Sequence, residues 1–427
     1  MPVSSSFRLL QAETDGALER ARTLDPDEII AIVERSGLRG RGGAGFPLAT
    51  KMRAVRSAAR GPGETADTNE GSDDQGVETY VIANAYDADP GSPLSRTLLE
   101  RRPELVIDGV AIAARAVGAH QAYLYLHPEA DGARSSAESA LSRRAGALDG
   151  VTIEIALGPG GFMGGEESAL LAVLESRRAM ARQRPPWPAE QGLQLRPTLI
   201  SCAETLAVLP RIVRDGPEAF RVAGTAGSRG TKLVSVTGAV ARPAVHEVPF
   251  GTTLGEILDL AGGTTAPLKG IHVGGPTGGI LNATRTGVRL DYEELKEAGT
   301  HVGSAQVRAI PDRTCIVNEA ATLFAYLARE SCAICVPCRV GTKRVGGILE
   351  GIYSGLGRED DLPWLDELAA HLQDFSLCGF GITSASIVRT TTREFPDDYR
   401  AHIVERRCPT GTCTPARARR YETMVQP

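Results

Sequence analysis

Short apolar runs alternate with amphipathic stretches over the first half of the chain. The runs at 80–84, 122–126 and 151–157 have the length of strands, and the first of them ends at a polar loop. The stretches at 97–117 and 133–147, which separate these runs, have helical character. Because strands and helices alternate, this half of the chain predicts a parallel sheet with helices on its faces.

The N-terminal region has helical periodicity over residues 1–36 and again over 48–59. Gly37 ends the first helical stretch, and residues 39–46 form a glycine-rich loop before the second. The stretch 61–75 contains almost no apolar residue, so we interpret it as a mobile surface insertion.

A different pattern occupies residues 231–282. Residues 232–238 alternate like a strand, and a return strand follows. Thr252 or Thr253 is the expected N-cap of a short helix, after which another strand leads into a further glycine-rich loop. This order resembles a small α+β module of the β-grasp type. From about 316 to 400 the periodicity is mostly helical.

Cysteines provide the strongest chemical signal. Cys332, Cys335 and Cys338 follow one another at C-x2-C-x2-C spacing, and Cys378 lies further along the chain. Three thiolates this close can bind three corners of one cubane, so the pattern is typical of a [4Fe–4S] cluster bound by four cysteines. A zinc site, which more often shows two separated pairs, and purely structural thiols are the alternatives. A disulfide framework is not expected in a chain this long with so few cysteines.

Composition narrows the class of protein. The net charge of −5 and the lack of a basic stripe with aromatic residues argue against a nucleic-acid binder. The chain has no apolar run of about 18 residues that would predict a membrane span, and its N-terminus lacks the apolar core of a signal peptide. Eight cysteines, most of them clustered, fit a reducing cytoplasm. A length of 427 residues allows two or three domains.

Two glycine-rich loops precede helices and are candidates for nucleotide binding. In the loop at 39–46, backbone N–H groups at a helix N-terminus favour phosphate and two arginines add charge, although a tight turn without ligand is the alternative. The loop at 158–168 carries Glu166 and Glu167. These acids either stabilise a helix start or hydrogen-bond a ribose or flavin ring. Trp187, fixed between prolines, either stacks on an adenine or packs internally.

Five stretches of the chain together resemble the NADH-binding flavoprotein subunit of respiratory complex I and its relatives in NAD-linked hydrogenases and formate dehydrogenases. The resemblance implies an α/β fold with a Rossmann-like FMN/NAD domain (1–228), a β-grasp module of the SLBB type (229–312) and a helical [4Fe–4S] domain with a C-terminal tail (313–427). The stretches run in the family's order and are 37–47, 84–91, 158–170, 274–279, and 330–339 with Cys378.

The resemblance also implies an enzyme that oxidises NADH. Electrons pass in this family from NADH through FMN to the [4Fe–4S] cluster and on to a partner subunit, because a flavin can accept a hydride and release single electrons. A small thioredoxin-like [2Fe–2S] subunit is the expected redox partner. The expected location is the cytoplasm, with any link to a membrane made through partner subunits.

The family's site residues carry over position by position. The resemblance places Glu166 and Glu167 beside the flavin and nicotinamide as the catalytic pair. The expected ligands of the cluster are Cys332, Cys335, Cys338 and Cys378. The expected cofactor-binding residues are Gly40, Gly42, Gly43, Gly45, Phe46, Lys51, Asn84, Asp89, Gly165, Glu166, Glu167, Trp187, Ser201 and Cys202.

Several positions around the expected flavin depart from the family's pattern. Tyr86 replaces an acid, Phe162 replaces a tyrosine, and Gly164 replaces a cysteine. Ser201 and Cys202 replace two asparagines that hydrogen-bond FMN in the family. Losing several such hydrogen bonds, each worth about 0.5–1.5 kcal/mol, weakens flavin binding. The alternative function is a divergent paralogue that keeps the cluster without flavin or NADH chemistry and acts as an electron relay or assembly subunit.

The C-terminal tail carries a further cysteine pair, Cys408 and Cys413, at C-x4-C spacing. This pair could bind another metal or contact a partner, and the spacing alone favours a structural or partner-facing tail. The seven histidines are scattered, none in an H-E-x-x-H pattern, and none is assigned a role. The sequence leaves open whether Cys202 is a reactive thiol or inert packing.

Overall fold

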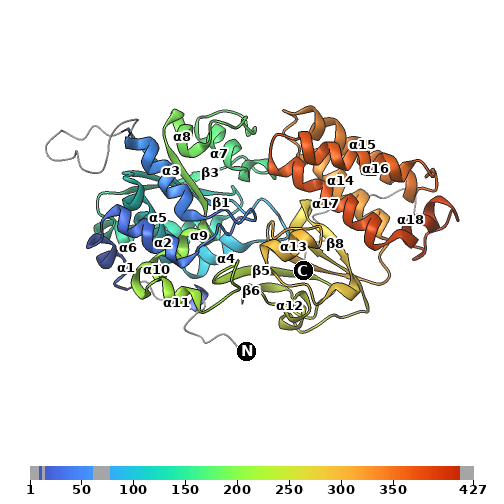
Figure 1. Ribbon diagram of the computed structural model, residues 1–427, viewed down its shortest axis with the longest axis horizontal. Coiled ribbons are helices and arrows are strands. Elements are labelled where there is room, and N and C mark those ends of the chain that lie inside the picture. Colours follow the sequence, from blue (N-terminus) through green and yellow to red (C-terminus); the bar gives the residue numbers. More distant parts are fainter. Residues whose placement is uncertain (1–8, 12–14, 61–76, 414–427) are drawn as a thin grey trace. The chain divides into compact units, whose positions relative to one another are not determined.

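The chain forms two compact units, seen in the computed structural model of Figure 1. The structure describes residues 9–11, 15–60 and 77–413. The first unit comprises residues 1–87, 94–160 and 164–232, and the second comprises 88–93, 161–163 and 233–427. Two short segments from the first half of the chain thus belong to the second unit. The insertion expected at 61–75 lies outside the described residues.

A four-stranded parallel sheet lies at the core of the first unit. Its order is β3-β2-β1-β4, and every neighbouring pair is parallel. The chain steps outward from β1 to β3 on one side of β1 and then adds β4 on the other side. The strand order therefore reverses between β1 and β4, and ligands of open α/β sheets bind at the carboxyl ends of strands at such a point. The strands are β1 (Tyr80–Ala85), β2 (Gln121–Leu126), β3 (Thr152–Leu157) and β4 (Thr198–Cys202).

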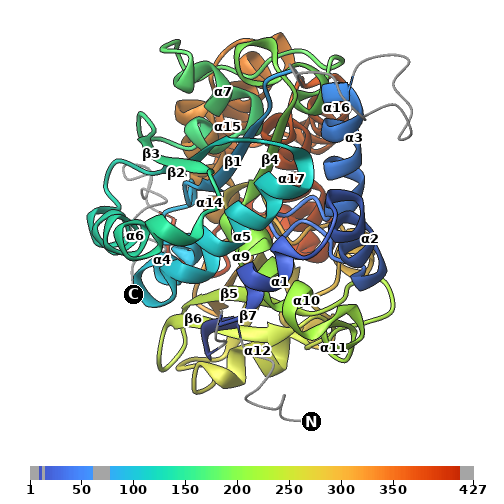
Figure 2. The same cartoon turned by 90° about the vertical axis from the view of Figure 1, so that its left-hand side faces the viewer.

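Helices cover the sheet of the first unit (Figure 2). Helix α5 (Pro103–Val117), rich in valine, isoleucine and alanine, is buried over almost its whole length and contacts β1. It crosses α9 (Ala203–Ala207) at Gly109, where a Cβ atom would lie 2.0 Å from the carbonyl oxygen of Leu206. Only glycine permits this approach. The other helices of the unit are α1 (Ala17–Arg22), α2 (Pro26–Ser36), α3 (Leu48–Arg60), α4 (Leu94–Arg101), α6 (Asp131–Arg144), α7 (Glu167–Leu174), α8 (Pro188–Gln191), α10 (Leu209–Asp215) and α11 (Pro217–Arg221).

Two of the expected helices are each divided in two. The helical region at 1–36 breaks before α2, because Asp25 and Glu28 form a capping box and Pro26 occupies the first helical position. The helix expected at 97–117 breaks before Pro103, since proline restricts the preceding residue and starts α5. A continuous helix over either range is therefore wrong, whereas the three strands expected in this half are confirmed.

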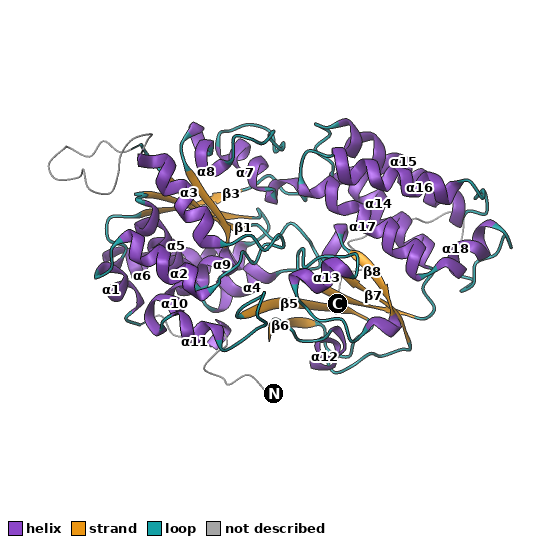
Figure 3. Ribbon diagram, viewed as in Figure 1, coloured by secondary structure: helices purple, strands orange, loops and turns teal. Residues whose placement is uncertain are grey.

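The second unit combines a five-stranded mixed sheet with a group of helices (Figure 3). The sheet has the order β6-β5-β9-β7-β8, in which β5 runs parallel to β9 and β7 runs antiparallel to both β8 and β9. Thr253 is the N-cap of the short helix α12, as expected, and its hydroxyl accepts from the N–H of Glu256 at 3.2 Å. The elements are β5 (Thr231–Gly238), β6 (Ala244–Pro249), α12 (Leu254–Leu260), β7 (Leu268–Val273), β8 (Gly279–Asn282), α13 (Tyr292–Glu297) and β9 (Gln306–Pro311).

Buried polar contacts connect this sheet to the helices that follow it. The N–H of Ile280 on β8 donates to the Thr390 hydroxyl on α17 at 2.9 Å. Arg308 on β9 pairs with Glu319 on α14 at 2.6 Å, and both side chains are buried. These contacts join the mixed sheet to the helices within the second unit. The helices are α14 (Ile316–Glu330), α15 (Val336–Tyr353), α16 (Asp361–Phe375), α17 (Gly379–Glu394) and α18 (Pro396–Ile403).

The architecture matches the expected fold class: a parallel sheet with helices, then a small mixed sheet, then a helical region. The three expected domains, 1–228, 229–312 and 313–427, stay a prediction, because the second compact unit contains both the mixed sheet and the helices. Within the described ranges, no helix combines the length and the apolar character needed to cross a membrane.

Candidate functional site

The carboxyl ends of β1 and β4 bring together polar residues from distant parts of the sequence. Asn84 on β1 lies directly opposite Cys202 on β4. The Asn84 side-chain amide donates to the carbonyl of Gly165 at 2.8 Å, and its oxygen accepts from the N–H of Tyr86 at 3.2 Å. Asn84 therefore attaches the second glycine-rich loop to the reversal point of the sheet.

The glycine-rich loop at 39–46 closes on itself and on the start of α9. The N–H of Gly40 donates to the carbonyl of Phe46 at 2.8 Å, and the N–H of Arg41 donates to the Thr205 hydroxyl at 2.7 Å. A Cβ atom on Gly42 would lie 3.6 Å from the Cβ of Cys202. A side chain at position 42 would therefore make an ordinary van der Waals contact with the end of β4, and the role of this loop at a phosphate stays a prediction.

The two arginines of this loop hold its backbone. Arg39 donates to the carbonyl of Gly45 at 2.7 Å. Arg41 is buried, and its guanidinium donates to the carbonyls of Arg39 at 2.9 Å and Arg229 at 2.5 Å. Arg41 is therefore a structural residue of the loop, and phosphate binding here would rely on backbone N–H groups.

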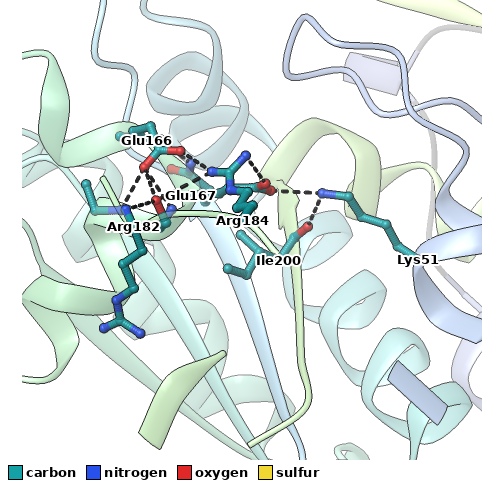
Figure 4. Close-up of polar contacts among 10 residues, drawn as sticks. Lys51, Glu166, Glu167, Arg182, Arg184 and Ile200 are labelled. Atoms are coloured by element: carbon teal, nitrogen blue, oxygen red, sulfur yellow. Dashed lines mark hydrogen bonds and ion pairs between the residues drawn. The ribbon is translucent and has the colours of Figure 1, made fainter. Parts of the chain in front are cut away.

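The acidic pair Glu166 and Glu167 lies in a network of charges at the start of α7 (Figure 4). Glu166 is the N-cap: one carboxylate oxygen accepts from the N–H groups of Ser168 at 2.9 Å and Ala169 at 2.8 Å, and the other pairs with Arg184. Its carboxylate is thus engaged in stabilising the helix start. The functional assignment of Glu166 stays a prediction.

Glu167 connects three elements of the first unit. Its carboxylate pairs with Lys51 of α3 at 3.0 Å and with Arg184 at 3.1 Å, and Lys51 also donates to the carbonyl of Ile200 on β4 at 3.3 Å (Figure 4). Burial opposes ionisation of Glu167, but the charges of Lys51 and Arg184 outweigh it and hold its pKa below the usual value. Glu167 is therefore a fixed anion at neutral pH, suited to position a ligand rather than to donate a proton.

Arg184 is the residue of this network that the sequence did not reveal. It pairs with both glutamates, and its guanidinium lies 5.5 Å from the ring centroid of Trp187. The available signal was indirect: two adjacent, half-buried acids are stabilised by cations, and several arginines follow α7. Trp187 and Phe46 expose 51% and 48% of their surface, so both rings are accessible for stacking.

The remaining expected cofactor residues divide between the two units. Ser201 and Cys202 lie at the end of β4, where burial raises the pKa of Cys202 and its thiol lies 2.9 Å from the Thr205 hydroxyl. The raised pKa disfavours the thiolate, which is the reactive form of a cysteine. Asp89 belongs to the second unit, where its buried carboxylate accepts from the N–H of Gly91 at 2.9 Å and from the Ser304 hydroxyl at 2.5 Å. Its predicted role at the flavin stays a prediction.

Tyr86 and Gly164, two of the departures from the family's pattern, form a single packing arrangement. Tyr86 is buried, and its ring stacks on Tyr125 with centroids 5.3 Å apart. A Cβ atom on Gly164 would lie 2.3 Å from the Tyr86 hydroxyl oxygen. The tyrosine therefore fills the volume that a side chain at position 164 would need. The phenyl ring of Phe162 lies in the second unit, against Phe380 at 5.3 Å.

The four cysteines expected to bind the cluster gather around the N-termini of two helices in the second unit. Cys335 is the N-cap of α15, Cys338 lies in its first turn, and Cys378 is the N-cap of α17. A Cβ atom on Gly381 of α17 would lie 3.2 Å from the Cβ of Cys338, so the two helix starts adjoin. The positive ends of both helix dipoles favour an anionic thiolate cluster.

The pKa of Cys338 reflects its burial and its closeness to two other cysteines of the motif. Burial, followed by the neighbouring Cys335 and Cys332, raises the pKa of Cys338 to about 11 despite a contact of 3.3 Å with the Ser331 hydroxyl. Thiols that compete for charge in this way are stabilised as thiolates by a bound metal.

Comparison with known protein families supports each part of this description. A family model described as the Nuo51 FMN-binding domain matches residues 33–211, and an SLBB domain matches 233–281. The model of the NADH-ubiquinone oxidoreductase-F iron-sulfur binding region matches residues 318–402. The matches follow the order of the parallel sheet, the mixed sheet and the helical region. The fold and the site thus define an iron–sulfur flavoprotein subunit.

Individual relatives span almost the whole chain. An F-type subunit of NADH-quinone oxidoreductase from Rhizobium meliloti (strain 1021) is 35% identical over 397 residues, which cover 90% of each protein. NADP-reducing hydrogenase subunit HndC of Solidesulfovibrio fructosivorans is 33% identical and covers 93% of this chain and 80% of its own. The crystal structure of an NAD+-reducing [NiFe]-hydrogenase in the H2-reduced state superposes with a TM-score of 0.83 at 35% identity, covering 94% of this chain and 67% of the hydrogenase chain. The chain belongs to the family of the F-type subunits of NADH-quinone oxidoreductase and the related hydrogenase subunits, and the resemblance expected from its motifs is confirmed.

Proposed function

We propose that this protein is the NADH-oxidising flavoprotein subunit of a larger redox complex, passing electrons to a [4Fe–4S] cluster and on to a partner subunit. One observation carries the proposal: a single chain contains both kinds of site. The first unit has a candidate nucleotide site where the strand order reverses between β1 and β4, and the second has four cysteines near the N-termini of α15 and α17. FMN, when bound, supplies the exchange between a hydride and single electrons that links a nicotinamide to such a cluster.

The residues of the first unit bind and orient in this proposal. The loop at 39–46 offers backbone N–H groups to a phosphate, and the fixed charges of Lys51 and Glu167 set the orientation of a bound ring system. Phe46 and Trp187 offer exposed aromatic faces for a nicotinamide or an adenine. Because Glu167 stays ionised, it acts as a hydrogen-bond acceptor, and Arg184 keeps it in place.

The residues of the second unit hold the cluster and protect it. Cys332, Cys338 and Cys378 are almost fully buried, which shields a cluster bound there from solvent. We further propose a small [2Fe–2S] subunit as the redox partner, and a cytoplasmic location with any membrane association through partner subunits. These two points rest on the family resemblance alone.

An anaerobic absorption spectrum of the purified protein, followed by addition of NADH, tests the proposal. Flavin bands that bleach with NADH are expected, and electron paramagnetic resonance then reports whether the cluster is reduced. NADPH is assayed in parallel, because one relative is named an NADP-reducing hydrogenase subunit. Broad iron–sulfur absorption without flavin, unchanged by either nucleotide, would contradict the proposal.

That contrary result would favour the second candidate function, a cluster-containing relay or assembly subunit without flavin. The observation behind this alternative is the changed set of residues around the site. Tyr86 is buried and packs on Tyr125. Ser201 and Cys202 have no side-chain amide that could hydrogen-bond a flavin. Flavin content therefore decides between the two functions.

Replacing Glu167 with glutamine is expected to lower kcat/KM for NADH by about 10- to 100-fold, which corresponds to about 1.4–2.7 kcal/mol. The change removes the anion that pairs with Lys51 and Arg184 while keeping the side-chain volume. Glu138→Gln is the matched control, because Glu138 forms an exposed ion pair with Arg134 at 3.2 Å on α6. Equal activity of the two variants would remove Glu167 from the proposed site.

The same carboxylate predicts the direction of a pH effect. Because the folded-state pKa of Glu167 lies below its usual value, its ion pairs stabilise the fold fully above about pH 4.5 and are lost as the pH falls through the lowered pKa. The acid limb of the unfolding curve should therefore be shallower for Glu167→Gln than for the unmodified protein. Thermal unfolding measured between pH 3 and 7 checks this difference.

A further inference from the structure

A second group of metal-binding side chains lies in the second unit, away from the four cluster cysteines. The group consists of Cys315, His402, Cys408 and Cys413, hereafter the Cys3His group, and its four ligand atoms all lie within 4.8 Å of one another. The Cys315 thiol lies 3.5 Å from Nε2 of His402, and the Cys413 thiol lies 3.3 Å from the same nitrogen. No part of the proposed electron path uses these residues.

The distances match those expected around a single tetrahedral ion. Zinc binds cysteine sulfur at about 2.3 Å and histidine nitrogen at about 2.0 Å, so neighbouring ligand atoms of a tetrahedron stand about 3.5–3.8 Å apart. The two sulfur–nitrogen separations of 3.5 and 3.3 Å are close to this value, and every pair of ligand atoms lies within 4.8 Å. Three thiolates and one imidazole are a common donor set of structural zinc sites.

The histidine of the group is held in the orientation that metal binding requires. His402 is buried on α18, and its Nδ1 lies 2.7 Å from the carbonyl oxygen of Asp398. Because a carbonyl can only accept, Nδ1 carries a proton, which leaves Nε2 as the ring nitrogen that would bind a metal. A backbone carbonyl bound to the second ring nitrogen is a usual feature of histidine ligands to metals.

The ligands come from three segments of the second unit. Cys315 is the buried N-cap of α14, His402 lies near the end of α18, and the two remaining cysteines lie on the irregular segment after α18. That segment has no helix or strand beyond residue 403 within the described chain, and Gly411 adopts φ 64° between its two cysteines. A bound ion would fix this segment where regular hydrogen bonding does not.

We propose that the Cys3His group binds one structural Zn2+ ion that fastens the segment 404–413 to the start of α14 and to α18. The tight convergence of all four ligand atoms favours one ion over a cubane, whose thiolates are spread over four irons. The ion has no redox role, since Zn2+ does not change oxidation state. Binding displaces the thiol protons to solvent and forms three Zn–S bonds and one Zn–N bond.

The position of the site gives it a structural consequence for the cluster. Helix α14 begins after Cys315 and ends at Glu330, immediately before the segment that carries Cys332. Its 15 residues span about 22 Å at about 1.5 Å per residue, so the two metal sites lie at opposite ends of one helix. An ion at the start of α14 would hold the helix that leads into the cluster segment.

Metal analysis of the full-length protein, purified anaerobically with zinc supplied during expression, tests the proposal. Roughly one zinc per chain is expected in addition to the cluster iron. X-ray absorption at the zinc edge should show three sulfur neighbours and one nitrogen neighbour. In the double variant Cys408→Ser/Cys413→Ser, the zinc content per chain should fall at least fivefold and the iron content should stay unchanged. Cys202→Ser, a cysteine far from the group in sequence, is the matched control and should keep both metals.

Several outcomes would overturn the proposal, and each differs from failure of the proposed redox function. Substoichiometric zinc in the unmodified protein, zinc retained in the double variant, or an edge spectrum dominated by oxygen would each exclude the site. Iron in excess of the cluster that disappears in the double variant would show an iron site instead of zinc. Flavin content and bleaching by NADH report on the redox function and do not depend on these results.

Discussion

Replacing Cys335 with serine should remove the [4Fe–4S] cluster while leaving the fold and the flavin unit in place. Cys335 is the N-cap of α15, and serine is among the preferred N-cap residues, so the helix start is retained. Cys335 is also less buried than the other three cysteines, so little packing is lost. A serine hydroxyl is a much poorer ligand for iron than a thiolate, and the cluster needs four strong ligands.

The measurements for this variant are iron content, the reduced-cluster signal and two activities. Iron should fall from roughly four atoms per chain to below about one. Electron delivery to a protein acceptor should fall at least about 100-fold, which is about 2.7 kcal/mol or more. Bleaching of the flavin by NADH should persist, because Lys51 and Glu167 lie in the other compact unit.

Ser331→Ala is the control that separates ligation from the surroundings of the cluster. The Ser331 hydroxyl lies 3.3 Å from the Cys338 sulfur and also accepts from the N–H of Ala333 at 3.2 Å. Its loss should shift the reduction potential of the cluster and leave the iron content unchanged. Unchanged iron in Cys335→Ser would show that this cysteine is not a ligand.

Local sequence patterns predicted the helices and strands better than they predicted the residues that meet at the sites. The strands at 80–84 and 122–126 are short apolar runs between polar loops. Such runs are visible in the sequence because the residues that become buried in a sheet are apolar. The break before α2 is encoded by Asp25 and Pro26, but helical periodicity continues on both sides of it and hides the boundary.

The partners of site residues were harder to predict, because they come from segments distant in the sequence. Arg184 reaches the acidic pair from beyond the end of α7, and no spacing rule marks it. Cys315 lies 87 residues before His402, and neither has a neighbour at metal-ligand spacing that would draw attention to it. Only the close-spaced members, such as Cys408 and Cys413, left a trace in the sequence.

Tyr86 and Gly164 are also distant in the sequence, and the sequence alone counts Tyr86 as a change that weakens the flavin site. From the sequence, an acid lost at position 86 and a cysteine lost at position 164 are two independent changes. In the structure they are one, because the Tyr86 ring occupies the volume beside Gly164. The substitution pair is therefore a repacking beneath the second loop, and its effect on flavin binding has to be measured with both positions changed together.

Introducing cysteine at position 164 is accordingly expected to destabilise the protein strongly while Tyr86 is present. The new Cβ would lie 2.3 Å from the Tyr86 hydroxyl oxygen and 2.5 Å from its ring carbon Cζ. Tyr86 has no room to move, since it is buried between Tyr125 and His127. Overpacking of this kind costs about 1–3 kcal/mol or more of unfolding free energy. The loop that carries Glu166 and Glu167 would also shift, so flavin content should fall.

A double-mutant cycle with Tyr86→Ala makes this prediction decisive. In the Tyr86→Ala background the clash is gone, so Gly164→Cys should cost less than about 0.5 kcal/mol, giving a coupling energy of about 1–3 kcal/mol between the two positions. Gly146→Cys is the matched control, because Gly146 is exposed and a Cβ atom there meets no atom within 4 Å. Denaturant unfolding supplies the free energies, and flavin absorption in the same samples supplies the binding. Additive effects of the two substitutions would mean that Tyr86 does not constrain position 164, and the altered residues around the flavin would then have to be explained separately.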